Sequence, residues 1–262
     1  MLNNWYLIFA AALIESFLIS IALTALMRWI ANRWDIVDHP GERKIHTKPI
    51  PVLGGVAIYL TFNIVIFGNL LLLEPAGYLG FHWIKDNVLV FLGESAWRPL
   101  LGIVAGGFVI FLLGVVDDVR PLKPEAKLTG QIVAALILVL SGIRLDLFIE
   151  PLLRNLPLIA DMSTTSFGVI TKVVSSLVTM FWVIMMTNSM NFLDNMDGLC
   201  GGVSAIAAIS FFLCILPHEE YFICALLMVF AGSVSGFLYH NLNPARIFMG
   251  DAGAMFCGYI LA

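Results

Sequence analysis

The stretch PLLGIVAGGFVIFLLGVVDD, residues 99–118, decides the fold class of this chain. Residues 99–116 carry no charge, and a run of that length fits a helix that crosses about 30 Å of hydrocarbon. The run then ends in Asp117 and Asp118. A carboxylate beside hydrocarbon is costly unless it is paired or bound to a metal, so these acids are candidate functional residues. The stretch predicts a membrane-spanning helix that ends in a polar site.

The rest of the chain repeats this pattern. Of its 262 residues, 60% are hydrophobic and 12% are charged, and the mean hydropathy of +0.94 is far above that of soluble domains. Further apolar spans are expected at residues 5–27, 52–73, 128–143, 171–187, 199–216 and 221–238, with the start of an eighth near residue 252. The loops are too short for a separate domain. We therefore expect an all-α polytopic transmembrane bundle, one domain over residues 1–262.

The two ends of the chain carry separate expectations. The first apolar run is too long for a signal peptide and has no basic residue before it, so we expect it to remain as a span. The last apolar segment runs only from Ala252 to Ala262, too short to cross a bilayer at about 1.5 Å per residue. The sequence therefore predicts a partial eighth span and a chain that is incomplete at its C-terminus.

Basic residues predict the orientation of the spans. With the N-terminus outside, the inside loops hold nine lysines and arginines and the outside loops hold five. Short cytoplasmic loops carry an excess of Lys and Arg, so this assignment is favoured. The loops after spans one, three, five and seven are then cytoplasmic. Five aspartates fall in the last three of these loops or at their edges: Asp117, Asp118, Asp194, Asp197 and Asp251.

The first two cytoplasmic loops contain a candidate phosphate-binding residue and an acidic pair. Lys48 lies three residues before Pro51, near the expected start of the second span, where a bound anion would offset an unfavourable helix dipole. Ordinary positive-inside anchoring is the alternative. Asp117 and Asp118 oppose the dipole at a helix C-terminus and repel each other, a cost that a divalent cation would relieve. Two solvated loop acids are the alternative.

The third cytoplasmic loop gives the sharpest signal. Asn191, Asp194 and Asp197 are spaced by three, so on a helical turn they would share one face. An amide and two carboxylates together suit a hard cation or the polar groups of a ligand. Asp197 could instead cap the sixth span. Capping would leave Asn191 and Asp194 unexplained, so the functional interpretation is favoured.

The fourth loop places Asp251 between Gly250 and Ala252-Gly253. Asp251 could cap the eighth segment, but the glycines would allow other groups to approach closely, which favours a metal ligand. Arg246 in the same loop would hold an anion or a lipid headgroup.

Five other polar or thiol side chains interrupt the apolar segments. Glu15 lies within the first span, where it would face a cavity, stay protonated or pair with another helix. The cysteines lie in or beside apolar segments without a Cys-x-x-Cys motif, so we expect small buried apolar side chains, neither disulfides nor metal ligands: Cys200, Cys214, Cys224 and Cys257.

In this order, these loop motifs resemble the polyprenyl-phosphate N-acetylhexosamine-1-phosphate transferases, from Asp38 to the end of the chain. The motifs are Lys48-x-x-Pro51-x-x-Gly54-Gly55, Asp117-Asp118 followed by Lys127, Asn191-Phe-Leu-Asp194-Asn-Met-Asp197-Gly198-Leu, and Asn241 with Pro-Ala-Arg-Ile-Phe-Met-Gly-Asp251. The first loop is similar to the undecaprenyl-phosphate GlcNAc-1-phosphate transferase branch. The Lys-x-Gly-Thr-Pro-Thr-Met-Gly-Gly run of the phospho-MurNAc-pentapeptide branch is absent from the sequence.

The resemblance implies a reaction and a cell location. A polyprenyl phosphate would attack the β-phosphorus of a UDP-sugar, giving a polyprenyl-diphospho-sugar and UMP, with Mg²⁺, or Mn²⁺ in its place, as cofactor. Its partners would be the UDP-sugar, polyprenyl phosphate and membrane lipid, with no nucleic acid, and a homodimer is compatible with it. The location would be the plasma membrane of a bacterium, with the active site on the cytoplasmic face.

The resemblance also assigns roles to residues. Asp251 would be the main magnesium ligand, and Asp117 would deprotonate or orient the lipid phosphate, with Asp118 beside it. Lys48 and Lys127 would neutralise phosphates. The nucleotide and diphosphate site would be shaped by Asn191, Asp194, Asp197 and Asn241.

One departure and two alternative classes remain. The family carries a histidine-rich motif and further spans beyond the Gly-Asp segment, so we expect the 262-residue chain alone to be weak or inactive. A cation- or proton-coupled transporter would more naturally place its acids in mid-span or at broken helices. A catalytically inactive lipid-binding protein is the third class.

Overall fold

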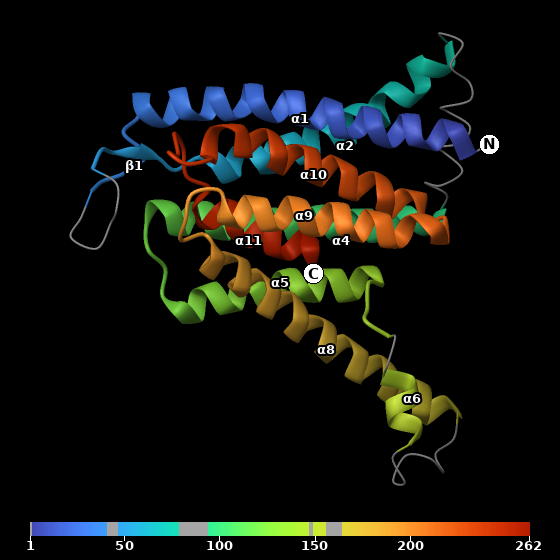
Figure 1. The fold of residues 1–262 in the computed structure, drawn as a ribbon. Helices are drawn as coiled ribbons and strands as arrows, with labels where there is room; N and C mark the ends of the chain where they lie inside the picture. Colours follow the sequence, from blue (N-terminus) through green and yellow to red (C-terminus); the bar gives the residue numbers. More distant parts are fainter. Residues whose placement is uncertain (1, 41–46, 79–93, 147–148, 156–163) are drawn as a thin grey trace.

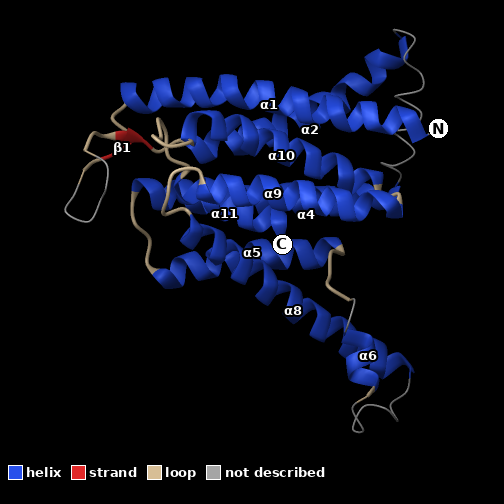
Figure 2. Ribbon diagram, viewed as in Figure 1, coloured by secondary structure: helices blue, strands red, loops and turns tan. Residues whose placement is uncertain are grey.

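The fold is a bundle of long helices with almost no sheet, in a computed structural model that describes residues 2–40, 47–78, 94–146, 149–155 and 164–262 (Figures 1 and 2). The helices are α1 (Leu2–Arg33), α2 (Gly54–Tyr78), α4 (Glu94–Val119), α5 (Pro124–Ser141), α6 (Ile149–Arg154), α8 (Thr164–Leu193), α9 (Leu199–Ile215), the short 3-10 helix η1 (Leu216–His218), α10 (Tyr221–Asn241) and α11 (Gly250–Leu261). Strands β1 (Val37–Asp38) and β2 (Ile50–Pro51) pair antiparallel between α1 and α2. The predicted all-α class is confirmed.

Seven helices are long and apolar enough to cross a membrane, which confirms the predicted spans. They cover Trp5–Arg33, Gly54–Leu72, Ala96–Val119, Pro124–Ser141, Thr164–Leu193, Leu199–His218 and Tyr221–Asn241. The fifth was predicted too short, at residues 171–187, because its ends are polar. Lys172 is one of the five basic residues that the charge count assigns to outside loops, but it lies inside α8. Large side chains face outward along the helices, for example Leu71 at 77% exposure and Phe181 at 67%, as a lipid-facing surface requires.

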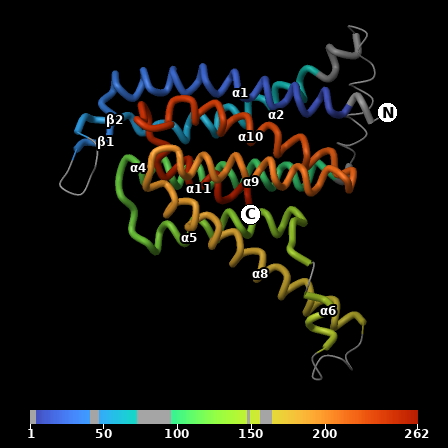
Figure 3. The backbone as a smooth tube through the Cα atoms, viewed as in Figure 1, coloured from blue at the N-terminus to red at the C-terminus, as the bar shows by residue number. Residues whose placement is uncertain are grey.

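The candidate site residues gather at one end of this bundle. The tube in Figure 3 shows that α1, α4, α8 and α10 end there, while α2, α5, α9 and α11 begin there. The loops that carry the five aspartates therefore lie at the same end, as the charge count predicted.

Helix α11 lies in the centre and packs against α2, α4, α8 and α9. Its 12 residues are shorter than a span, and nearly all are buried. Close backbone approach at its start depends on small residues. A Cβ at Gly55 of α2 would lie 2.1 Å from the Gly253 nitrogen, and one at Gly114 of α4 would lie 2.3 Å from the Ala252 Cα. These close approaches at Gly55 and Gly114 bring the Asp251 end of α11 next to α2 and α4.

Helices α1 and α10 run side by side in the same direction and also pack closely. A Cβ at Gly232 of α10 would lie 1.9 Å from the Ser16 Oγ of α1. Near this interface Asn69 of α2 donates a hydrogen bond to the Glu15 carboxylate, at 3.0 Å. Of the three possibilities for Glu15, the structure therefore supports pairing with another helix.

The four cysteines are free thiols. Cys200, Cys224 and Cys257 are buried as predicted, but Cys214 is exposed. Cys214 lies on α9, whose outer face carries exposed apolar side chains such as Leu213, so a small apolar residue there need not be covered by protein.

Candidate functional site

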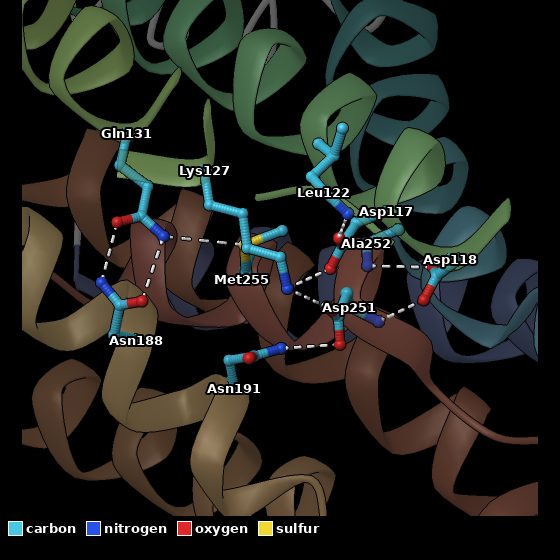
Figure 4. Close-up of polar contacts among 10 residues, drawn as sticks. All are labelled: Asp117, Asp118, Leu122, Lys127, Gln131, Asn188, Asn191, Asp251, Ala252 and Met255. Atoms are coloured by element: carbon cyan, nitrogen blue, oxygen red, sulfur yellow. Dashed lines mark hydrogen bonds and ion pairs between the residues drawn. The ribbon is translucent and has the colours of Figure 1, made fainter. Parts of the chain in front are cut away.

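Asp117 and Asp118 lie in the last turn of helix α4, and their carboxylates have separate partners (Figure 4). The Asp117 carboxylate is buried, accepts a hydrogen bond from the Leu122 N–H at 2.7 Å, and forms an ion pair with the Lys127 ammonium. Lys127 lies one turn into α5, and its ammonium brings a positive charge to the end of α4. The repulsion expected between two adjacent solvated acids is therefore relieved by the protein itself.

Asp118 binds the start of another helix. Its carboxylate accepts hydrogen bonds from the backbone N–H groups of Asp251, at 2.7 Å, and Ala252, at 3.1 Å. These N–H groups belong to the first turn of α11 and have no partner within their own helix. The geometry needs glycine before Asp251, because Gly250 has a φ of 71° and a Cβ there would lie 2.8 Å from the Asp118 Oδ2. Asp118 thus fixes the backbone that carries Asp251.

The Asp251 carboxylate lies between two donors from different helices. The Lys127 ammonium donates to its Oδ2 at 2.8 Å, and the Asn191 amide donates to its Oδ1 at 2.9 Å. Burial tends to raise the pKa of Asp251, but hydrogen bonds with Asp117, Lys127 and Asn191 outweigh it and hold the pKa below its usual value. Asp251 lies inside α11 and caps no helix with its side chain, so the capping alternative is wrong.

Asp194 lies in the turn after α8, close to this group. Burial, followed by the negative charge of Asp251, raises the pKa of Asp194 to about 7, although the Gly250 N–H hydrogen bond acts the other way. A carboxyl group with this pKa exchanges its proton near neutral pH.

Asp197 and Asn241 hold together the turn after α8 and the loop after α10. The Asp197 carboxylate accepts hydrogen bonds from the Asn243 amide, at 3.0 Å, and the Ala245 N–H, at 2.9 Å. The Asn241 side chain accepts from the Gly198 N–H and donates to the Ile247 carbonyl, both at 2.9 Å. These contacts join the α8–α9 turn to the loop before α11.

The predicted shared face of Asn191, Asp194 and Asp197 is therefore wrong. Helix α8 ends at Leu193, so only Asn191 is helical, and the three side chains have different neighbours. The capping alternative for Asp197 is also wrong, because α9 begins after Gly198, whose φ of 75° makes the turn without a side-chain cap. A three-residue spacing implies one face only where the helix continues through all three positions.

Lys48 and Arg246 are the two basic candidates in the loops before α2 and α11. Both are exposed; the Arg246 N–H donates to the His240 carbonyl at 2.9 Å. The helix-dipole argument for Lys48 is wrong, because β2 precedes α2, which begins only at Gly54. The first N–H groups of α2, at Gly54 and Gly55, donate to the carbonyls of Phe248 and Met249, so they offer no anion site.

Two functional-site neighbours were missed in the sequence. Gln131 and Asn188 form a reciprocal amide pair between α5 and α8, one helical turn further into the bundle than the site. The available signal was their place along the chain: Gln131 follows Lys127 by four residues, and Asn188 precedes Asn191 by three.

The site offers carboxylate oxygens to a divalent cation. Within the described residues, no group of three or more His, Cys, Asp or Glu side chains is arranged to hold a metal ion. However, carboxylate oxygens of Asp117 and Asp251 already converge on one positive centre, the Lys127 ammonium. Mg²⁺ typically binds one or two protein carboxylates together with substrate phosphates and water. The two carboxylates fit that mode of binding.

Comparisons with known proteins place the chain in a family. Residues 100–262 match the family model described as glycosyl transferase family 4. A probable undecaprenyl-phosphate N-acetylglucosaminyl 1-phosphate transferase from Bacillus subtilis (strain 168) is 29% identical over 100% of this chain and 63% of its own length. A decaprenyl-phosphate N-acetylglucosaminephosphotransferase from Mycobacterium leprae (strain TN) is 32% identical over 91% of this chain and 56% of its own length. A phospho-N-acetylmuramoyl-pentapeptide-transferase from Bacillus thuringiensis (strain Al Hakam) is 26% identical over 94% of this chain and 71% of its own length. The chain thus spans less than two thirds of the length of the Bacillus subtilis and Mycobacterium leprae relatives.

Proposed function

Because the chain belongs to glycosyl transferase family 4, we propose that it is a membrane-embedded transferase domain that moves an N-acetylhexosamine-1-phosphate from a UDP-sugar to a polyprenyl phosphate. The names of the Bacillus subtilis and Mycobacterium leprae relatives favour GlcNAc-1-phosphate as the transferred group. The positive-inside count supports placing the site end of the bundle in the cytoplasm of a bacterial cell, where UDP-sugars are made.

The proposed reaction is one phosphoryl transfer. An oxygen of the polyprenyl phosphate forms a bond to the β-phosphorus of the UDP-sugar. The bond between that phosphorus and the oxygen bridging to the α-phosphate breaks, and UMP leaves with that oxygen. Such transfers depend mainly on positioning and on neutralising charge, which fits a site built from fixed ionic groups.

The ion-paired cluster Asp117–Lys127–Asp251 carries the proposal, because it brings an acid–cation–acid arrangement from three helices to one point. Asp117 would take a proton from the lipid phosphate or orient it, since the Asp117 carboxylate is the most enclosed of this group. Lys127 would neutralise phosphate charge. Asp251 and Asp117 would hold Mg²⁺, which supplies charge neutralisation to the diphosphate when bound.

The remaining polar residues would act around this cluster. Asn191 and Asp194 flank Asp251 and would contact the diphosphate. Asp197 and Asn241 would shape the nucleotide site through the loops that they join. Lys48 and Arg246, which are exposed at the same end, would reach a phosphate or a lipid headgroup from outside the cluster.

The test is a transfer assay with the full-length protein. Purified protein, UDP-GlcNAc, polyprenyl phosphate and Mg²⁺ should release UMP, and Asp251→Asn should reduce the rate by about 100-fold or more, because the carboxylate charge is removed. The matched control is Asp146→Asn, which neutralises an exposed acid in the loop after α5, at the opposite end of the bundle. UMP release that survives Asp251→Asn would contradict the role of Asp251. A panel in which no UDP-sugar reacts would contradict the function.

A further inference from the structure

A second polar layer, formed by Gln131 and Asn188, lies one helical turn further into the bundle than the ionic site. The Gln131 amide nitrogen donates to the Asn188 Oδ1 at 3.2 Å, and the Asn188 amide nitrogen donates to the Gln131 Oε1 at 2.8 Å. The same Gln131 nitrogen lies 3.8 Å from the Met255 Sδ. Gln131 is only 1% exposed, so protein encloses its side chain, and Figure 4 shows its contacts with Asn188 and Met255. One glutamine from α5 thus contacts both α8 and α11.

The two layers use the same three helices in the same register. Gln131 lies one turn from Lys127 on α5, and Asn188 lies one turn from Asn191 on α8. On α11, Met255 lies one turn from Asp251. The upper layer joins these helices through the Asp251 carboxylate, with Lys127 on one oxygen and Asn191 on the other. Any slide or rotation of α5 against α8 would therefore break contacts in both layers.

A buried polar pair that only satisfies its own hydrogen bonds is the simpler explanation. Neighbouring hydroxyl groups on α8 behave in that way: Thr187 donates to the Val183 carbonyl of its own helix, at 2.7 Å. Gln131 differs, because its amide nitrogen and its amide oxygen both bind Asn188 across the helix interface. Amides paired in this reciprocal way fix distance and rotation between two helices, which one apolar contact does not.

We infer that Gln131 is a positioning residue for the transfer reaction. By locking α5 to α8, it sets the distance between Lys127 and Asn191 on the two sides of Asp251. This inference rests on the proposed function, but the geometry of the Lys127 contact can be measured without any turnover.

The first experiment removes the amide and keeps the side-chain length. In the full-length protein, Gln131→Met should lower kcat roughly 10- to 100-fold while the KM for the UDP-sugar changes little, because a misplacement of about 1 Å affects the reacting geometry more than binding. The control is Thr187→Val, which removes a buried hydroxyl group next to Asn188 on α8 that donates only within its own helix. Wild-type kcat in Gln131→Met would overturn the inference.

The second experiment reports on position without activity. Lys127 should react slowly with an amine-acylating reagent while it is paired with Asp117 and Asp251, and exposed Lys123 on the preceding turn is the internal reference. We expect the ratio of Lys127 to Lys123 acylation, measured by mass spectrometry, to rise several-fold in Gln131→Met and to stay unchanged in Thr187→Val. An unchanged ratio in Gln131→Met would overturn the inference even if the protein proved to have no transferase activity.

A swapped double variant keeps the test decisive if Gln131→Met folds poorly. Gln131→Asn combined with Asn188→Gln restores one long and one short amide facing each other. We expect the double variant to recover both kcat and the acylation ratio relative to either single change, by coupling between the two positions. If the double variant loses as much kcat as the two single variants combined, the inference is overturned.

Discussion

The α1–α10 interface and the α5–α8–α11 interface both bury polar side chains, but they use them differently. Between α1 and α10 most of these polar groups are hydroxyls, and Ser16 and Ser233 donate to carbonyls of their own helices. Ser20 and the His240 ring reach across, but each meets a backbone carbonyl of the other helix and no side chain. Between α5, α8 and α11 the groups are amides and charges that bind each other across helices. The first interface lets backbones approach; the second holds charged groups at set positions. Only the second can serve chemistry.

The largest loss of stability should come from placing a large side chain between α1 and α10. Gly232→Leu places atoms where a Cβ alone would lie 1.9 Å from the Ser16 Oγ and 2.5 Å from the Leu13 carbonyl oxygen. We expect a loss of about 3 kcal/mol or more in the free energy of unfolding, because a backbone carbonyl cannot move aside. The folded fraction in detergent measures it. Gly168→Leu on α8, where a Cβ meets nothing within 4 Å, is the control. Equal folded fractions for the two variants would contradict the prediction.

A smaller loss should follow removal of the bond between α4 and α11. Asp118→Ala leaves the N–H groups of Asp251 and Ala252 without their acceptor, and we expect a cost of about 2 kcal/mol together with lower transfer activity. Denaturant titration and the UMP assay measure the two effects. Asp146→Ala, at the opposite end, should change neither. Full activity in Asp118→Ala would show that α11 needs no help to place Asp251.

Asp194 should make the site end sensitive to pH. Burial, and then the charge of Asp251, raises the pKa of Asp194 to about 7, so this group favours the folded state at low pH and the contribution is lost as the pH rises through 7. Asp194→Asn should therefore be more stable than the wild type at pH 8, by about 1 kcal/mol after allowance for partial exposure, and should lose this advantage near pH 4. Melting curves in metal-free buffer at both pH values measure it. The same difference at both pH values would rule out the assignment.

The smallest effect should come from a hydroxyl that its own helix satisfies. Ser16 donates only to carbonyls of the preceding turn, at 2.6 and 3.1 Å, so Ser16→Ala should cost about 0.5 kcal/mol. Ser20→Ala is the comparison, because Ser20 donates across to the Ser233 carbonyl and its loss should cost about 1 kcal/mol. Thermal unfolding of both variants would show whether a contact between helices is worth more than one within a helix.

Much of the fold could be predicted because hydrophobicity acts locally. Runs such as residues 99–116 predicted the spans, and loop charges predicted that all five aspartates share one end. The central position of α11 could not be predicted from its 12 residues, which are uncharged apart from Asp251, since a buried core helix and a partial span have the same composition.

The site was predicted as a set of residues but not as a set of contacts. The role of Asp118 depends on a backbone 133 positions later in the chain, and no local pattern encodes such a contact. The spacing of Asn191 and Asp194 correctly indicated two polar residues of the site, but it predicted a shared helix face that does not form, because α8 ends between them. Gln131 was overlooked because one glutamine in an apolar helix has no motif.

The hydrogen bond between Asp118 and the start of α11 also concerns the order of biosynthesis. A ribosome that adds about 5–20 residues per second needs roughly 7–27 s to pass from Asp118 to Asp251. During that interval α4, α5 and the next three long helices enter the membrane while the Asp117-Asp118 pair still lacks its partners on α11. The nascent chain must therefore keep two acids solvated at the membrane surface, and the cluster can form only after the segment that carries Asp251 has emerged.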